Sequence, residues 1–320
     1  MAATLKPGWS KPAAILFASE CPPNEKTFGF ALAQAAEFRA HLIIFHAYKS
    51  SAAGAAETSE RRCYYDTDAH AERHMLEPLA ERARNLRIHS KTVFRPGLPA
   101  DEILNFLSAH KIDRVVMGAH SPGPVGKVLV GSVAEAVLRK ANVPVCIVGP
   151  NVSEGTYRNV VTRKVLCDVG RHEASPVIAR FGAGVAVEHN ASLVLHHVIP
   201  PQERAEILGD RTTAQIEAEL PSLIPDRWKN RVSVRTRVAL GDPAEELLYQ
   251  GRAQQADLIV MGAEGASQFA AATRAGIVYK VLAYAHCPVI TLSPIVLADC
   301  GDARYVRPPA AAVNYMAGVV

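Results

Sequence analysis

The residues with the clearest capacity for chemistry lie in one glycine-containing loop, between an apolar run and a helical pattern. Residues 117–135 read MGAHSPGPVGKVLVGSVAE. Glycines let a backbone approach a ligand closely and adopt positive φ angles. The loop ends at Gly131-Ser132, at the expected start of a helix, where free N–H groups and the helix dipole suit a phosphate. The loop predicts an anion site, which His120 could contact and Lys127 could neutralise.

The same residues also have a purely structural interpretation. Residues 132–135, SVAE, have the pattern of a capping box, in which a serine hydroxyl caps the helix without any ligand. Gly131 would then be only a turn residue. The loop is not a P-loop, because Ser121 stands at the first glycine position and Val128 at the Ser/Thr position.

Other candidate groups have simpler explanations. His70 and His74 are four residues apart on a predicted helix, a spacing that can bind a metal, but no HExxH context accompanies them. A solvated helix face explains them better. His46 and His197 occupy equivalent ends of predicted strands, where we expect packing. No Ser-His-Asp or Cys-His arrangement follows from the chain order, so we expect neither catalytic residues nor a metal site.

The elements that must position the loop occur twice along the chain. Residues 113–120 read DRVVMGAH and residues 257–264 read DLIVMGAE, about 144 residues later. ANVPVCIV and AHCPVITL repeat at the same interval. A period of this length is a whole domain rather than a short repeat unit. The sequence therefore predicts a first domain at 1–150, a second at 151–296, and a C-terminal tail at 297–320 that we expect to be disordered.

Each half alternates short apolar runs with amphipathic segments, the pattern of a parallel sheet covered on both faces. We expect strands near 13–19, 41–47, 88–95, 113–119, 143–149, 162–168, 192–198, 231–239, 257–262 and 287–293. We expect helices near 25–39, 67–86, 99–110, 132–141, 173–189, 203–220, 243–254 and 276–285. The stretch 48–62 has no repeat counterpart and is expected to be a surface loop.

Bulk properties exclude several classes of protein. The 320 residues carry a formal net charge of +4, without a basic stripe interleaved with aromatics, so nucleic acid is not an expected partner. No apolar run reaches transmembrane length, so a membrane is not expected either. The apolar run near the N-terminus is too short for a signal peptide. Six cysteines without a CxxC pair indicate free thiols and a reducing compartment, the cytoplasm.

Taken together, these motifs resemble the universal stress protein family. The resemblance rests on the strand ending VMG, the G-x2-G-x9-G-[ST] loop, the helix beginning SVAEAVL and the final strand VPVCIV. It covers most of 12–149 and again about 160–294. It implies two tandem doubly wound α/β domains, each a five-stranded parallel sheet of order 3-2-1-4-5 with helices on both faces. It also implies that the domains pair through their last strands as an intramolecular pseudo-dimer, with a further homodimer left open.

The resemblance implies a site for ATP or AMP, with Mg²⁺ accompanying the nucleotide. Gly118, Gly131 and Ser132 match the family's glycine motif, whereas Ser121 replaces its second glycine. Glu20 stands where the family places an aspartate for the nucleoside. The backbone and apolar positions that line the adenine and phosphate pocket match Ala18, Ala47, Met117 and Val133.

The second half departs further from the motif. Ala275-Gly276 replaces Gly-Ser, and Gly170 stands at the position of the first-strand carboxylate. Glu264, in place of His120, would bring negative charge close to phosphates. We therefore expect the second domain to keep the fold and to have lost the site.

These observations lead to two hypotheses of different classes. The first is a stress-response protein that binds an adenine nucleotide in its first domain as a ligand or switch, with at most slow hydrolysis. The second is a stress-response scaffold that binds no nucleotide and works through protein partners.

Overall fold

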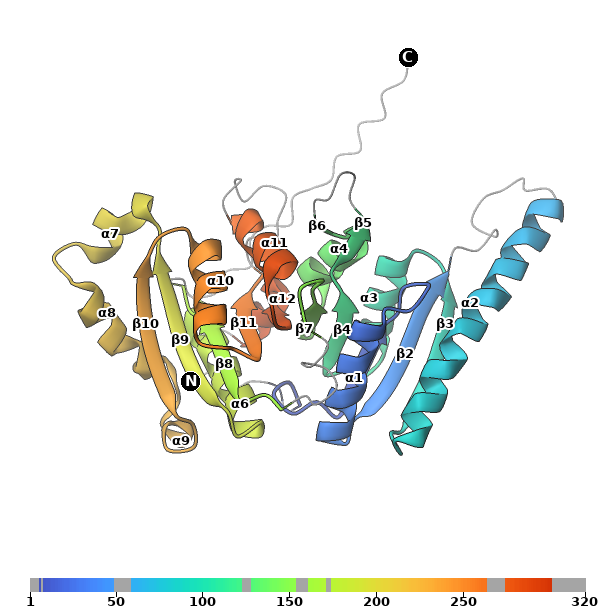
Figure 1. The fold of residues 1–320 in the computed structure, drawn as a ribbon, viewed down its shortest axis with the longest axis horizontal. Helices are drawn as coiled ribbons and strands as arrows, with labels where there is room; N and C mark the ends of the chain where they lie inside the picture. Colours follow the sequence, from blue (N-terminus) through green and yellow to red (C-terminus); the bar gives the residue numbers. More distant parts are fainter. Residues whose placement is uncertain are drawn as a thin grey trace, which may run out of the picture.

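A computed structural model describes residue 6 and residues 8–48, 59–122, 128–153, 161–170, 174–263 and 274–300. Ten strands form one sheet in the order β10-β9-β8-β11-β12-β7-β4-β1-β2-β3, from left to right in Figure 1. The strands are β1 (Ala14–Ala18), β2 (His41–Tyr48), β3 (Ser90–Pro96), β4 (Arg114–Gly118), β7 (Val145–Val148), β8 (Lys164–Asp168), β9 (Ser192–Ile199), β10 (Val234–Leu240), β11 (Leu258–Gly262) and β12 (Val289–Leu292).

Within each half the five strands are parallel and follow the order 3-2-1-4-5, which confirms the predicted fold class. Their central residues are apolar and buried, as in β7 and β12, where all four residues are buried. Strands of this kind read as continuous apolar runs because helices cover both faces of the sheet. This is why the sequence placed all ten strands to within a few residues.

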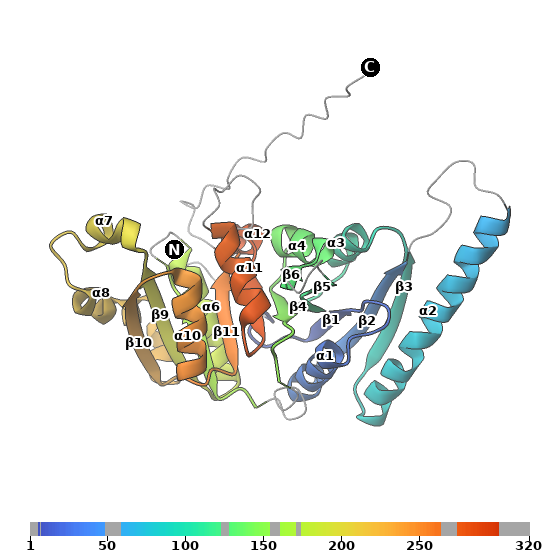
Figure 2. The same ribbon diagram turned by 45° about the horizontal axis from the view of Figure 1, so that its top comes forward.

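The helices lie on the two faces of the sheet, each over its own apolar cluster. One face carries α1 (Glu25–Phe38), α2 (Ser59–Asn85), α6 (Ser175–Glu188), α8 (Thr213–Glu219) and α12 (Pro294–Cys300). The other carries α3 (Pro99–Ala109), α4 (Ser132–Lys140), α10 (Pro243–Ala253) and α11 (Arg274–Tyr284). In both views α2 lies along β3 at the outer end of the first half (Figures 1 and 2).

The two halves join through their last strands, as the family resemblance implied. β7 and β12 pair antiparallel, with Val289 opposite Ile147 and Ile290 opposite Cys146. The Thr291 hydroxyl donates a hydrogen bond to the carbonyl of Val145 at 3.2 Å. The two half-sheets are therefore one continuous sheet.

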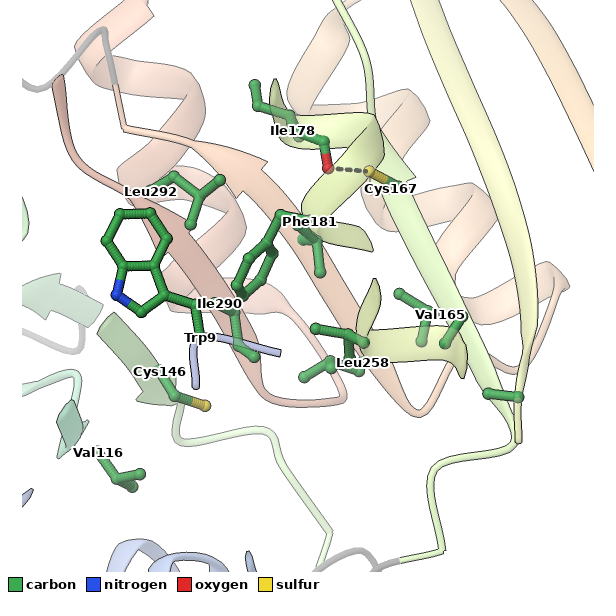
Figure 3. Close-up of a cluster of buried hydrophobic side chains, with 14 of the residues drawn as sticks. Trp9, Val116, Cys146, Val165, Cys167, Ile178, Phe181, Leu258, Ile290 and Leu292 are labelled. Carbon is green, nitrogen blue, oxygen red and sulfur yellow. Dashed lines mark hydrogen bonds between the residues drawn. The ribbon is translucent and has the colours of Figure 1, made fainter. Parts of the chain in front are cut away.

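The apolar core also continues across the junction. Figure 3 shows Trp9 beside Ile290 and Leu292 of β12, with Phe181 of α6 nearby, all in one buried cluster. Beneath it, the fully buried Arg114 donates to the Trp9 carbonyl at 2.9 Å. Burial lowers the pKa of Arg114 to about 10, so the guanidinium stays charged at neutral pH. The N-terminal segment thus ties the first domain to the second.

Two predicted helices differ from expectation. Helix α2 begins at Ser59 rather than near 67, so the end of the stretch 48–62 is helical and not loop; residues 49–58 lie outside the described part. The expected helix 203–220 is divided into η3 (Pro201–Glu203), α7 (Arg204–Leu208) and α8. The break comes at Gly209, with a φ of 50°, and α8 restarts on a capping box formed by Thr212 and Gln215.

The end of the second domain contains a helix that the sequence analysis missed. Helix α12 runs across the expected start of the tail at 297, and Leu297 is fully buried. The Ser293 hydroxyl caps it by accepting from the Val296 N–H at 3.2 Å. Residues 301–320 lie outside the described part of the chain. Among the described residues, no helix is long and apolar enough to cross a membrane.

Candidate functional site

The candidate site begins where three parallel strands end side by side. Ala18, the last residue of β1, lies between Phe45 of β2 and Met117 of β4 in the strand register. The Ser19 N–H continues the pairing by donating to the Phe45 carbonyl at 2.8 Å. Ala47 lies two residues further along β2. The structure therefore brings together the apolar positions that the sequence analysis assigned to a nucleoside pocket.

The glycine loop leaves β4 and returns to the same point through a small hairpin. β5 (His120–Pro122) and β6 (Val128–Val130) pair antiparallel, with His120 opposite Val130 and Ser121 opposite Leu129. At the base of the hairpin the Gly131 N–H donates to the Ala119 carbonyl at 3.2 Å. This bond holds the end of β4 against the start of α4. Only the backbone of His120 and Ser121 is described, and Lys127 lies outside the described residues.

The start of α4 corrects the predicted capping box. The N-cap residue is Gly131, with φ −65° and ψ 152°, which has no side chain with which to cap the helix. Ser132 is the first helical residue and is exposed, while Val133 is half-buried. Glu135 faces Arg139 at 3.4 Å rather than returning to the cap. The prediction failed because a capping box needs the serine one position earlier, outside the first helical turn.

Glu20 is exposed, two residues beyond the end of β1 and in the loop that leads to α1. Its neighbour Ser19 is held by His46, whose Nδ1 lies 2.8 Å from the Ser19 carbonyl oxygen. The other ring nitrogen of His46 lies 3.2 Å from a carboxylate oxygen of Glu72 on α2. Sequence reasoning assigned His46 to packing and missed these contacts, because no local pattern links a strand end to a distant helix.

The two histidines considered as metal ligands lie on α2. His70 is exposed, and His74 lies 3.2 Å from Glu77 on the surface. Within the described part of the chain, no group of three or more His, Cys, Asp or Glu side chains could hold a metal ion.

The second domain differs from the first at the matching strand ends. In the first domain Ala18, Phe45 and Val93 form an apolar row across β1, β2 and β3. The equivalent row in the second domain is polar: Asp168, His196 and Arg237, in register across β8, β9 and β10. Sequence analysis missed this row because its members only become neighbours through the sheet.

The polar row has unusual protonation properties. Burial raises the pKa of Asp168 to about 7. Burial, with smaller effects of His197 and Arg237, lowers the pKa of His196 to about 4. His196 is fully buried, and neither of its ring nitrogens has a hydrogen-bond partner among the described residues. This edge of the second domain therefore carries polar, ionisable side chains, where the first domain has an apolar row.

The phosphate side of the second domain also differs. Helix α11 is described from Arg274 to Tyr284, so Ala275 and Gly276 lie within the helix rather than at a glycine-serine cap before it. Gly276 is exposed, and a Cβ there would have no atom of the described residues within 4 Å. Residue Glu264 lies outside the described residues. Gly170 stands at the position equivalent to Glu20 and offers no carboxylate.

The fold defines a class: two tandem doubly wound α/β domains, whose candidate site lies at the carboxyl edge of the sheet, where such sheets bind ligands. The model of the universal stress protein family matches residues 14–149 and 162–293. The chain therefore belongs to the universal stress protein family.

Individual relatives agree with this assignment. A universal stress protein of Mycolicibacterium smegmatis is 30% identical over 191 residues, which is 56% of this chain and 61% of the relative. One from Methanocaldococcus jannaschii is 38% identical over 63 residues, 20% of this chain and 36% of the relative. The matched regions thus span less than two thirds of the length of these two relatives. A universal stress protein structure from Archaeoglobus fulgidus has the same fold, with a TM-score of 0.65, 17% identity, and coverage of 88% of this chain and 98% of that chain.

Proposed function

We propose that the first domain binds an adenine nucleotide, ATP or AMP, at the carboxyl edge of β1, β2 and β4. The observation that carries the proposal is the hydrogen bond from Gly131 to Ala119, because it places the uncapped start of α4 beside the end of β4. The N–H groups of that first turn suit the phosphates. The nucleoside then lies toward Ala18 and Ala47, with Glu20 near the ribose.

The other candidate residues have subsidiary roles in this proposal. His120 and Lys127 belong to the sequence between β4 and α4, and in this proposal they supply a polar and a positive group to the phosphates. Met117 and Val133 line the pocket as apolar residues, and Ser121 stands where the family motif has a glycine. Magnesium accompanies ATP chiefly through the phosphates, as Mg²⁺ commonly does.

The second domain is proposed to hold no nucleotide at its equivalent site. Asp168 replaces the small apolar Ala18, and a helical turn replaces the glycine-serine cap. Its role is to complete the sheet and the shared core. We assign no catalytic residue, and the nucleotide acts as a ligand that controls contacts with protein partners.

We place the protein in the cytoplasm because its buried thiols suit a reducing compartment. Cys146, Cys167 and Cys287 are free and buried.

A pair of matched substitutions tests the proposal. Ser132→Glu puts a negative charge at the start of α4, where it repels phosphate but favours the helix. We expect ATP affinity to fall about tenfold or more. Gly276→Glu, at the equivalent position 144 residues later, lies on an exposed face of α11 and should leave affinity unchanged. Equal affinities for Ser132→Glu and the wild type would contradict the site, and absence of binding by the wild type would favour the scaffold without nucleotide.

A further inference from the structure

The segment that carries Glu20 is held by one face of helix α2. Glu72, Met75 and Arg82 lie along this face, at intervals of three and seven residues, which brings side chains to the same side of a helix. Met75 contacts Cys21 directly, Arg82 contacts the start of α1, and Glu72 contacts His46 of β2, which in turn contacts Ser19. The helix itself is fixed in the core beneath, where Leu76 and Leu79 are buried.

The first contact lies immediately before Glu20. His46, with a side chain only 7% exposed, bridges the Ser19 carbonyl at 2.8 Å and the Glu72 carboxylate at 3.2 Å. Its ring also stacks on Phe94 of β3, with the ring centres 5.6 Å apart. Glu72 thus holds the His46 ring, and this ring in turn holds the backbone of Ser19.

The second contact lies immediately after Glu20. The Cys21 thiol donates to the Met75 thioether at 3.4 Å. Burial and the nearby Glu72 both raise the pKa of the Cys21 thiol, so it keeps its proton for this contact. Glu20 therefore lies between two residues that are tied to α2: Ser19 indirectly, through His46 of β2, and Cys21 directly, through Met75.

The third contact fixes the far end of the loop. Arg82 forms an ion pair with Glu25 in the first turn of α1 at 2.5 Å, and its guanidinium lies 5.0 Å from the centre of the Phe28 ring. The loop thus cannot move away from the strand ends without breaking contacts with α2.

We propose that α2 is the positioning element for Glu20, and that the His46–Glu72 pair is its main contact. In this arrangement Glu72 never touches the nucleotide. It holds His46, which holds Ser19, so that the Glu20 carboxylate faces the ribose hydroxyls. The inference rests on the proposed nucleotide site and assigns the basis of its sugar selectivity.

The test compares the affinities of ATP and 2′-deoxy-ATP by calorimetric titration of the full chain. Deoxyribose lacks the 2′-hydroxyl and cannot make a hydrogen bond from it to the charged Glu20 carboxylate. Such a hydrogen bond contributes about tenfold in affinity or more. We expect the wild type to prefer ATP by about that factor, and Glu72→Ala to reduce the preference to near one. A general effect on folding would weaken both nucleotides equally and leave their ratio unchanged.

The matched control is Glu77→Ala on the same helix. Glu77 is also paired with a histidine, His74 at 3.2 Å, but this pair lies on the exposed surface away from the loop. Its removal should leave the preference for ATP intact. His46→Phe keeps the aromatic ring over Phe94 while removing both polar contacts, and should resemble Glu72→Ala.

A double-mutant cycle shows whether Glu72 acts through Glu20. If it does, Glu72→Ala should produce no further loss of preference in a Glu20→Gln background. Additive losses, or an unchanged preference in Glu72→Ala, would overturn the inference while leaving the nucleotide site in place. A wild type that binds neither nucleotide would overturn the proposed function and the inference together.

Discussion

The Ser293 hydroxyl of the second domain donates a 2.5 Å hydrogen bond to the carbonyl of Ala141 in the first. Ala141 is the residue at which α4 ends, so the bond joins the end of one domain's helix to the residue after the other domain's last strand. On the opposite side of the pseudo-twofold, Gly149 is equivalent to Ser293. A Cβ at Gly149 would lie 2.6 Å from the Leu282 carbonyl oxygen, so glycine is needed for α11 to approach. The two domains are thus in close contact on both sides of the pseudo-twofold.

From the hydrogen bond between Ser293 and Ala141, we predict that Ser293→Ala lowers the stability of the whole chain. Ser293 is buried, and its removal leaves the Ala141 carbonyl without this donor and α12 without its cap. We expect a loss of about 1–3 kcal/mol in the free energy of unfolding, measured in urea. Ser222→Ala is the control, because Ser222 also donates to a carbonyl, that of Glu219, but is exposed. A Ser293→Ala protein as stable as the control would contradict the role of this bond.

Asp168 predicts a pH dependence of stability. Its folded pKa of about 7 lies above its ordinary value of 3.8, so the folded protein keeps a proton that the unfolded chain releases near pH 4. Stability should therefore fall as the pH rises from about 4 to about 7. Asp168→Asn removes this effect and should be the more stable protein at pH 8, by about 4 kcal/mol.

The measurement is the difference in unfolding free energy between Asp168→Asn and the wild type at pH 5 and pH 8. His196 contributes an opposite trend, since its lowered pKa makes stability fall as the pH drops from about 6.5 to about 4. This trend is common to both proteins and cancels in the difference. A difference that does not grow between pH 5 and pH 8 would show that Asp168 ionises normally.

His196 should cost stability in its present position. The ring is fully buried, and its nitrogens lack partners among the described residues, whereas the first domain has Phe45 at the equivalent place. We expect His196→Phe to raise the free energy of unfolding by about 1–3 kcal/mol at pH 7. The reciprocal Phe45→His should lower it. If His196→Phe is the less stable protein, the ring has a compensating partner.

From the position of Ser132 at the start of α4, we predict that Ser132→Ala weakens nucleotide binding without lowering the stability of the protein. Ser132 is the exposed first residue of the helix and not its N-cap, so alanine there should change the unfolding free energy by less than about 0.5 kcal/mol. Loss of the hydroxyl should nevertheless weaken nucleotide binding, about fivefold. Thermal unfolding and calorimetric titration of the same preparation check both expectations. A loss of stability near 1 kcal/mol would restore the capping interpretation.

Much of the fold could be predicted because its information is local. Apolar runs such as LIIF at 42–45 mark strands buried on both faces, and Asp242-Pro243 correctly marks the start of α10, where the Asp242 side chain accepts from the Glu245 N–H. The break at Gly209 was missed although the sequence carries two local signals for it, the Gly209-Asp210 pair and the capping box of Thr212 and Gln215. Helix α12 was missed because only packing against α4 and α6 fixes so short a helix.

The candidate site was predictable only in part. The glycine loop and its neighbours on β1 and β4 could be found from motif spacing, and the strand register brings them together. The hairpin β5–β6 was not expected, because short strands in a glycine-rich segment have no apolar alternation. The His46–Glu72 contact and the Asp168–His196 row join residues 26 or more positions apart, and sheet topology alone makes them neighbours.

The central claim is that one domain of the two binds an adenine nucleotide. The most direct measurement is a calorimetric titration of the full chain, freed of any carried-over ligand, with ATP and Mg²⁺. The account predicts one site per chain, and its loss in Ser132→Glu. No binding at millimolar ATP, or two sites per chain, would contradict it.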